Sequence, residues 1–214
     1  MRLAVNRFSL FALCLVVWSS HCLALGNPAG GPLSAAATVG KPAPGFTLDG
    51  SDGKKHSLSD YRGKVVVLEW VNYDCPFVKK HYGSGSMQTL QKKYVAKDVV
   101  WLSVNSSAPG KQGNYPAEKI NELLKEKKAA PTAYLFDPDG KAGTAYGAKT
   151  TPHMFVIDPK GTLVYAGAID NKPTTDVEDI RAAKNYVDIA LYEVLAGKPV
   201  TTSSTQSYGC SVKY

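Results

Sequence analysis

An apolar run and a helical pattern meet within residues 65–82, which read VVVLEWVNYDCPFVKKHY. The β-branched run at 65–71 predicts a central strand that is buried on both faces. Cys75 is followed by Pro76, and proline is favoured at the first position of a helix because no backbone N–H is needed there. We therefore expect Cys75 to be a helix N-cap, with free backbone donors and the positive end of the helix dipole beside its sulfur. Such a thiol is more acidic and more reactive than a free one, although a buried, inert cysteine is the alternative.

The first 24 residues have the pattern of a signal peptide. Arg2 and Arg7 give a basic start, and residues 8–18 form an apolar core that is short for a membrane span. We expect cleavage near residue 24, export to the periplasm or another extracytoplasmic space, and no membrane span in the remaining chain. An uncleaved anchor is the alternative. The Gly-, Ala- and Pro-rich stretch 25–39 predicts a flexible lead-in.

Signal removal leaves two of the four cysteines, Cys75 and Cys210. In an oxidising compartment, two cysteines indicate a disulfide or a redox pair. Loss of two arginines also lowers the net charge from +7 to +5. The lysines are scattered and form no dense basic block, so nucleic acid is not an expected partner. The length suits a single domain at 40–198, followed by a polar tail, 199–214, that carries Cys210.

Strand and helix patterns alternate along the domain. This alternation predicts an α/β fold with a mixed central sheet, helices on both of its faces and an N-terminal β-hairpin extension. The expected strands lie at 46–48, 55–58, 65–71, 99–105, 132–136, 153–157 and 163–168, and the expected helices at 76–82, 87–94, 116–128 and 177–194.

Several of these motifs resemble the thioredoxin fold. They are the strand–Cys–helix joint, the Thr151-Pro152 pair that opens a later strand, and the VIDPKG turn at 156–161. The start GKPAPGFTL, at 40–48, resembles the peroxiredoxin branch of that superfamily, which includes alkyl hydroperoxide reductase and thiol-specific antioxidant proteins. The segments DCPFV at 74–78 and GCSVKY at 209–214 resemble a peroxiredoxin-like subgroup. The resemblance covers about residues 38–214 and implies a thioredoxin-like fold and reduction of hydroperoxides.

The two cysteines differ from the thioredoxin arrangement. Asn72 occupies the first position of a Cys-x-x-Cys spacing that would end at Cys75, so that local disulfide cannot form. Cys210 is the candidate resolving thiol. The roughly 12 residues between the last expected helix and Cys210 can span ~40 Å at ~3.3 Å per residue. Cys210 can thus meet Cys75 within one chain or between the chains of a homodimer; a static clamp of the tail or an unrelated free thiol is the alternative.

Further candidates surround the expected sulfur position. Lys79 follows Cys75 by one helical turn and adds positive charge on the same face. In the resembling fold, the proline equivalent to Pro152 is cis and faces the reactive sulfur, so we predict a cis Thr151–Pro152 bond at the site. The amide of Asn72 could donate to a thiolate or to a peroxide oxygen, or could serve only the turn.

Two titratable residues are candidates for a proton relay. Glu69 is an acid within an apolar strand, where burial would raise its pKa and let it shuttle the proton of the cysteine. A salt bridge at the strand end is the alternative. His153 follows Pro152 and could relay protons, or could be a structural imidazole.

These residues favour an extracytoplasmic thiol peroxidase. The Cys75 thiolate would attack a hydroperoxide and become a sulfenic acid, Cys210 would condense with it, and an external dithiol would restore both, with no metal or organic cofactor. Thiol–disulfide exchange with protein substrates is a second hypothesis. A third is not enzymatic: copper bound by Cys75 with His81 or His153, or a redox-silent scaffold.

Overall fold

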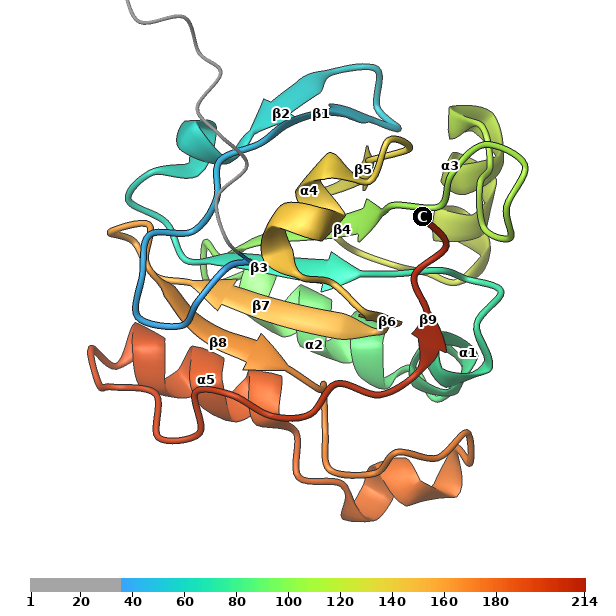
Figure 1. Ribbon diagram of the computed structural model, residues 1–214. Helices are drawn as coiled ribbons and strands as arrows, with labels where there is room; N and C mark the ends of the chain where they lie inside the picture. The colour runs from blue at the N-terminus through green and yellow to red at the C-terminus, as the bar shows by residue number, and fades with distance from the viewer. Residues whose placement is uncertain (1–35) are drawn as a thin grey trace, which may run out of the picture. The chain divides into compact units, whose positions relative to one another are not determined.

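The computed structural model describes residues 36–214, so the predicted signal peptide and most of the predicted lead-in lie outside the described residues (Figure 1). The strands are β1 Thr47–Gly50, β2 Lys55–Ser57, β3 Val66–Trp70, β4 Val100–Asn105, β5 Ala133–Phe136, β6 Thr150–Thr151, β7 His153–Ile157, β8 Leu163–Gly167 and β9 Cys210–Ser211. The α-helices are α1 Pro76–Gly83, α2 Ser86–Val95, α3 Ala117–Glu126, α4 Lys141–Tyr146 and α5 Tyr186–Leu195, and the 3-10 helices are η1 Leu58–Tyr61 and η2 Glu178–Ala182.

The central sheet is mixed, as predicted, and within residues 36–214 it has seven strands in the order β2-β1-β5-β4-β3-β7-β8. β4 pairs in parallel with β3 and with β5, whereas β7 pairs antiparallel with β3 and with β8. The hairpin β1–β2 joins the sheet through β5 and confirms the predicted N-terminal extension. All five residues of β3 are buried, which confirms that the apolar run is a central strand.

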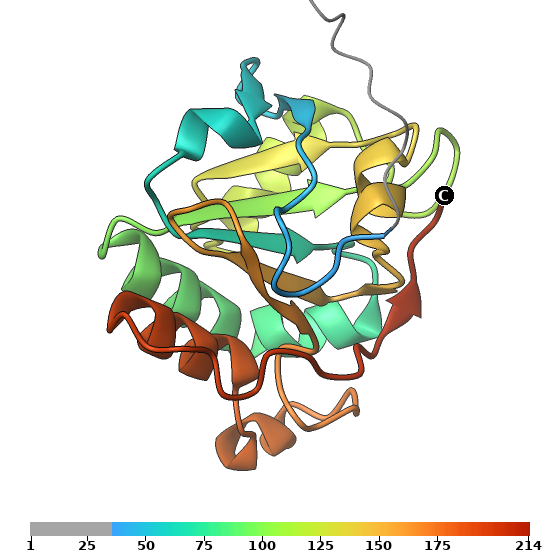
Figure 2. The same cartoon turned by 60° about the vertical axis from the view of Figure 1, so that its left-hand side comes forward.

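Helices cover both faces of this sheet, because alternate residues of each strand point to opposite sides. Val65 and Val67 pack into the core formed with α1, α2 and α5, whereas Leu68 and Trp70 pack into the core on the side of α4. α2 and α5 lie side by side (Figure 2). They are joined by a hydrogen bond from the hydroxyl of Tyr94 to the backbone oxygen of Asp188. The predicted helices on both faces are thus confirmed.

The helix predicted over 177–194 is wrong as a single element. It is divided into η2 and α5, with extended backbone at Ala183, where ψ is 134°. Asn185 then caps α5, because its side-chain oxygen accepts a hydrogen bond from the backbone N–H of Asp188 at 2.9 Å. Asparagine favours this N-cap role over a helix interior, which explains why the helix starts again there.

Three further elements, α4 and the short strands β6 and β9, were not predicted from the sequence. α4 has six residues and is enclosed by Gly140 and Gly147, which both adopt left-handed backbone conformations. β9 belongs to the tail at 199–214 and pairs antiparallel with β6, with Cys210 opposite Thr151. In Figure 1 the tail runs back along the domain and brings β9 beside β6, above α1. No helix of the described part of the chain is long and apolar enough to cross a membrane.

Candidate active site

Cys75 is the N-cap residue of α1, as predicted. Its backbone is extended, with φ −67° and ψ 127°, and Pro76 occupies the first position of the helix. The backbone N–H of Cys75 donates to the oxygen of Asn72 at 3.0 Å, and its carbonyl accepts from the N–H of Lys79 at 2.9 Å. The turn after the end of β3 and the first helical turn of α1 therefore hold the cysteine from both sides.

The sulfur of Cys75 is completely buried between two partners. It lies 3.0 Å from the backbone oxygen of Thr151 and 2.7 Å from Sγ of Cys210. Both cysteines are free thiols. The Thr151–Pro152 bond is cis, which confirms the prediction. The structure therefore brings the two cysteines of the expected mature chain together within one chain, at the cis-proline.

The surroundings shift the pKa values of the two thiols in opposite directions. Burial raises the pKa of Cys75, but hydrogen bonds from the Cys210 thiol and from the backbone amide of Val78 outweigh that effect, so the net pKa is lowered. Burial and the hydrogen bond to Cys75 raise the pKa of Cys210 to about 11. At neutral pH, Cys75 is therefore the better thiolate, and Cys210 keeps its proton and donates it toward that thiolate.

Cys210 reaches this position because its neighbour is a glycine. Gly209 has φ +133°, and a Cβ on it would lie 2.1 Å from the backbone oxygen of Thr151. Any side chain at this position would therefore push the tail away from β6. Sequence reasoning missed Gly209, although its place directly before the tail cysteine was a usable signal.

Among the described residues, the sulfur of Cys75 has hydrogen-bond partners at Thr151 and Cys210, and the side chains of Asn72 and Lys79 are not among them. Asn72 accepts from the backbone N–H of Asp74 at 2.9 Å and donates to the oxygen of Gln112 at 3.2 Å, so its amide is engaged by the turn and by the following loop. Lys79 is exposed on α1. The residue three positions after the N-cap is Val78, so neither position 72 nor position 78 offers a second cysteine.

Glu69 is buried in a network that lies apart from the two thiols. Its carboxylate accepts hydrogen bonds from Tyr82 at 2.9 Å and from Trp101 at 2.8 Å, and from Gln91 and Ser103 at 3.1 and 3.2 Å. Burial raises its pKa, against the opposing effect of these donors. The salt bridge considered as the alternative is absent among the described residues, because the donors are neutral.

His153 points away from the sulfur, into the core on the side of α4. Its Nδ1 accepts from the backbone N–H of Lys149 at 3.2 Å, and its ring lies 4.4 Å from that of Phe155. Burial lowers its pKa to about 4, so the ring is neutral at pH 7. This environment is that of a structural imidazole. Across residues 36–214, His, Cys, Asp and Glu side chains form no group of three or more that could hold a metal ion.

A buried cysteine at a helix N-terminus, opposite a cis-proline in this mixed sheet, defines a thiol oxidoreductase of the thioredoxin fold. The chain belongs to the AhpC/TSA family, whose model matches residues 39–166. This confirms the family to which the motifs of the sequence pointed.

The chain is similar both to thiol–disulfide oxidoreductases and to peroxiredoxins. It is 31% identical to the thiol-disulfide oxidoreductase ResA of Geobacillus thermodenitrificans, over 60% of this chain and 68% of that protein. It is 32% identical to peroxiredoxin-1 of Gallus gallus, over 61% of this chain and 69% of that protein. A solved structure of an uncharacterized conserved protein from Geobacillus kaustophilus superposes with a TM-score of 0.69 at 29% identity, covering 83% of this chain and 92% of that one. These relatives support thiol redox chemistry and include both reaction types.

Proposed function

We propose that this protein is a thiol peroxidase that reduces hydroperoxides with Cys75 as the attacking thiol and Cys210 as the resolving thiol. The observation that carries the proposal is the 2.7 Å separation of the two sulfurs. Their pKa values are shifted in opposite directions, downward for Cys75 and upward for Cys210. This geometry suits a cycle in which a disulfide forms and is reduced within one chain.

The burial of Cys75 favours a small oxidant. Its side chain has no exposed surface, and Sγ of Cys210, on β9, lies 2.7 Å from its sulfur. A hydroperoxide needs only a small opening beside the tail, whereas a disulfide of a folded protein needs the whole tail displaced. In the first step the Cys75 thiolate attacks the O–O bond, the sulfur becomes a sulfenic acid, and the leaving alkoxide or hydroxide takes a proton to give an alcohol or water.

Cys210 completes the oxidative half of the cycle. Its thiol attacks the sulfur of the Cys75 sulfenic acid, the disulfide forms and water leaves. Cys210 is partly exposed, whereas Cys75 is not. An external dithiol can therefore attack Sγ of Cys210 and expel Cys75, which is the better leaving group because its pKa is lower. A second thiol of the donor then releases Cys210, and both protein thiols are restored.

Thiol–disulfide exchange with protein substrates is the second candidate. The similarity to ResA favours it, since that relative is named for this activity. It would use the same pair, with Cys75 attacking a substrate disulfide and Cys210 resolving the mixed disulfide. With the predicted signal peptide, either reaction belongs to the periplasm or another extracytoplasmic compartment, with a dithiol reductant as partner.

A sulfenic-acid trap tests the peroxidase. The Cys210→Ser variant, reduced and then treated with excess hydrogen peroxide and dimedone, is expected to carry the adduct on Cys75 by mass spectrometry. The wild type is expected to form the Cys75–Cys210 disulfide instead. A Cys75→Ser variant serves as the unlabelled control. If Cys75 stays unlabelled and peroxide is not consumed, the proposal fails, and insulin reduction by the wild type would then support disulfide exchange.

A further inference from the structure

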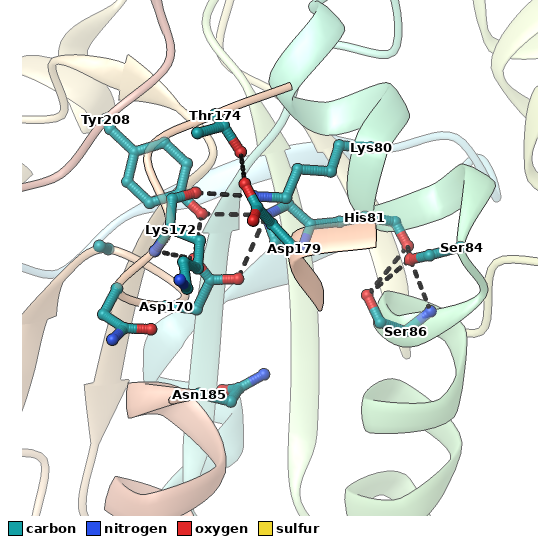
Figure 3. Close-up of polar contacts among 12 residues, drawn as sticks. Lys80, His81, Ser84, Ser86, Asp170, Lys172, Thr174, Asp179, Asn185 and Tyr208 are labelled. Atoms are coloured by element: carbon teal, nitrogen blue, oxygen red, sulfur yellow. Dashed lines mark hydrogen bonds and ion pairs between the residues drawn. The ribbon is translucent and has the colours of Figure 1, made fainter. Parts of the chain in front are cut away.

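A buried polar cluster connects the helix of Cys75 to the tail that carries Cys210. We call the set of His81, Asp170 and Tyr208 the tail latch. The hydroxyl of Tyr208 donates to Oδ1 of Asp170 at 2.5 Å and lies 3.2 Å from Nε2 of His81 (Figure 3). Nε2 of His81 is 4.0 Å from Oδ2 of Asp170. One phenol therefore joins a residue of α1 to a carboxylate that follows β8.

Two of the three latch residues are shielded from water, whereas Tyr208 is half-buried. His81 and Asp170 are 1% and 3% exposed. Burial lowers the pKa of His81 to about 4, so its ring is neutral at pH 7. The arrangement that satisfies every group has Nε2–H of His81 donating to the Tyr208 oxygen while the Tyr208 hydroxyl donates to Asp170. Next to the latch, the buried ammonium of Lys80 donates to the backbone oxygen of Lys172 at 2.7 Å. Its positive charge is opposite in sign to that of the Asp170 carboxylate.

The position of the latch in the chain relates it to the thiols. His81 lies on α1, the same short helix whose N-cap is Cys75. Tyr208 is separated from Cys210 by Gly209 alone. Helix α1 therefore connects the latch to Cys75, and Gly209 connects it to Cys210. Loss of the Tyr208 hydrogen bonds frees the tail directly beside Cys210.

Cys210 itself is held by the pairing of β9 with β6, and the tail has further anchors on both sides of it. On the N-terminal side, the backbone N–H of Thr205 donates to the oxygen of Ala166 at 3.2 Å, and the N–H of Ala166 donates to the oxygen of Ser203 at 3.1 Å. On the C-terminal side, Val212 donates to the oxygen of Lys149 at 3.0 Å, and the hydroxyl of Tyr214 donates to that of Ala148 at 2.8 Å. Between Thr205 and Cys210, Tyr208 is the tail residue whose side chain hydrogen-bonds to a buried group, the carboxylate of Asp170. We propose that the tail latch positions Cys210 against Cys75 and so sets how readily the disulfide forms.

This inference rests on the proposed use of Cys75 and Cys210 as a redox pair, but its test needs no peroxide. The reduced protein is equilibrated with oxidised and reduced glutathione, in which one glutathione disulfide oxidises the two thiols and yields two glutathione thiols. The measured equilibrium constant of the Cys75–Cys210 disulfide reports how well the fold places the two sulfurs. Tyr208→Phe is expected to lower it about 10- to 100-fold, the scale of one hydrogen bond to a charged group.

A matched control and a second variant complete the experiment. Tyr192→Phe removes a hydroxyl from a tyrosine that is 65% exposed on α5, and is expected to stay within about twofold of the wild type. Asp170→Asn keeps a neutral acceptor for Tyr208, so it is expected to lower the constant less than Tyr208→Phe does. It replaces that variant if Tyr208→Phe does not fold.

The proposal is overturned if the latch variants fold and keep the wild-type equilibrium constant within twofold. A lower urea midpoint with an unchanged constant would overturn it too, because it shows a purely structural role. Failure of the peroxide trap with an intact effect of Tyr208→Phe would reject the peroxidase and retain the latch.

Discussion

At Cys75, burial and hydrogen bonding act on the thiol in opposite directions. Burial alone would make a fully enclosed cysteine inert. The donors around the sulfur, above all the thiol of Cys210, reverse this effect and lower the pKa. Cys210 therefore matters before any oxidation occurs, because its hydrogen bond favours the thiolate of Cys75. In the proposed cycle it also supplies the second thiol of the disulfide.

Because the pKa of Cys75 depends on the hydrogen-bond donor at position 210, substitutions at that position should change it. Cys210→Val removes the donor and keeps the sulfur covered, so we expect the pKa of Cys75 to rise. Cys210→Ser keeps a hydroxyl donor and should raise it less. The measurement is the rate of iodoacetamide alkylation at Cys75 as a function of pH, followed by mass spectrometry. A midpoint in Cys210→Val at or below that of the wild type would show that another group sets the acidity.

Substitutions of Glu69 are expected to change stability and not the acidity of Cys75, because the hydrogen-bond partners of Glu69 belong to the core. Glu69→Leu leaves the N–H of Trp101 and the amide of Gln91 without their acceptor, which costs about 1–3 kcal/mol for each buried group. Glu69→Gln keeps one acceptor oxygen and should cost less. Urea unfolding measures both losses. The alkylation midpoint of Cys75 in Glu69→Gln should match the wild type; a shifted midpoint would instead support the relay role suggested by the sequence.

At the scale of elements, the pairing of β6 with β9 makes the site. β6 contributes Thr151, whose backbone oxygen contacts the sulfur of Cys75 and whose Cα partner in the pair is Cys210. The pair has only two residues in each strand, so its register depends on local fit more than on the number of hydrogen bonds. Gly209 supplies that fit, since it lets the two backbones approach closely.

Gly209→Ala is therefore expected to separate the two cysteines without unfolding the domain. Its methyl group would meet the oxygen of Thr151 at 2.1 Å, so β9 must move away. We expect the glutathione equilibrium constant of the disulfide to fall at least about tenfold, as for loss of a close backbone contact. Gly197→Ala is the matched control. Gly197 also has a positive φ, of 68°, but a Cβ there meets open space, so this variant should lose stability and keep the disulfide constant.

At the scale of the whole molecule, the sequence predicted what depends on periodic burial. The run at 65–71 identified β3, and Cys75-Pro76 identified the start of α1, because strand burial and proline at a helix start are local signals. The closing helix was predicted too long, since apolar spacing does not reveal that Asn185 caps a new helix. The tail latch was missed because His81 and Tyr208 are 127 residues apart and meet only in the folded chain.

We propose two roles for the tail, covering Cys75 and resolving its oxidised form, and a pair of variants can measure each. Deletion of 200–214 removes both roles, whereas Cys210→Ser in the full chain removes only the second. Because Cys75 is completely buried and Cys210 of the tail lies against its sulfur, the reduced deletion variant should be alkylated at Cys75 at least about tenfold faster than Cys210→Ser. Both variants should accumulate the sulfenic acid with peroxide, and the deletion variant should progress further to sulfinic acid. Circular dichroism and urea unfolding check that each variant is folded before the rates are compared. Equal alkylation rates in the two folded variants would show that the tail opens too readily to protect the thiol, and that a substrate as large as a protein disulfide can reach Cys75.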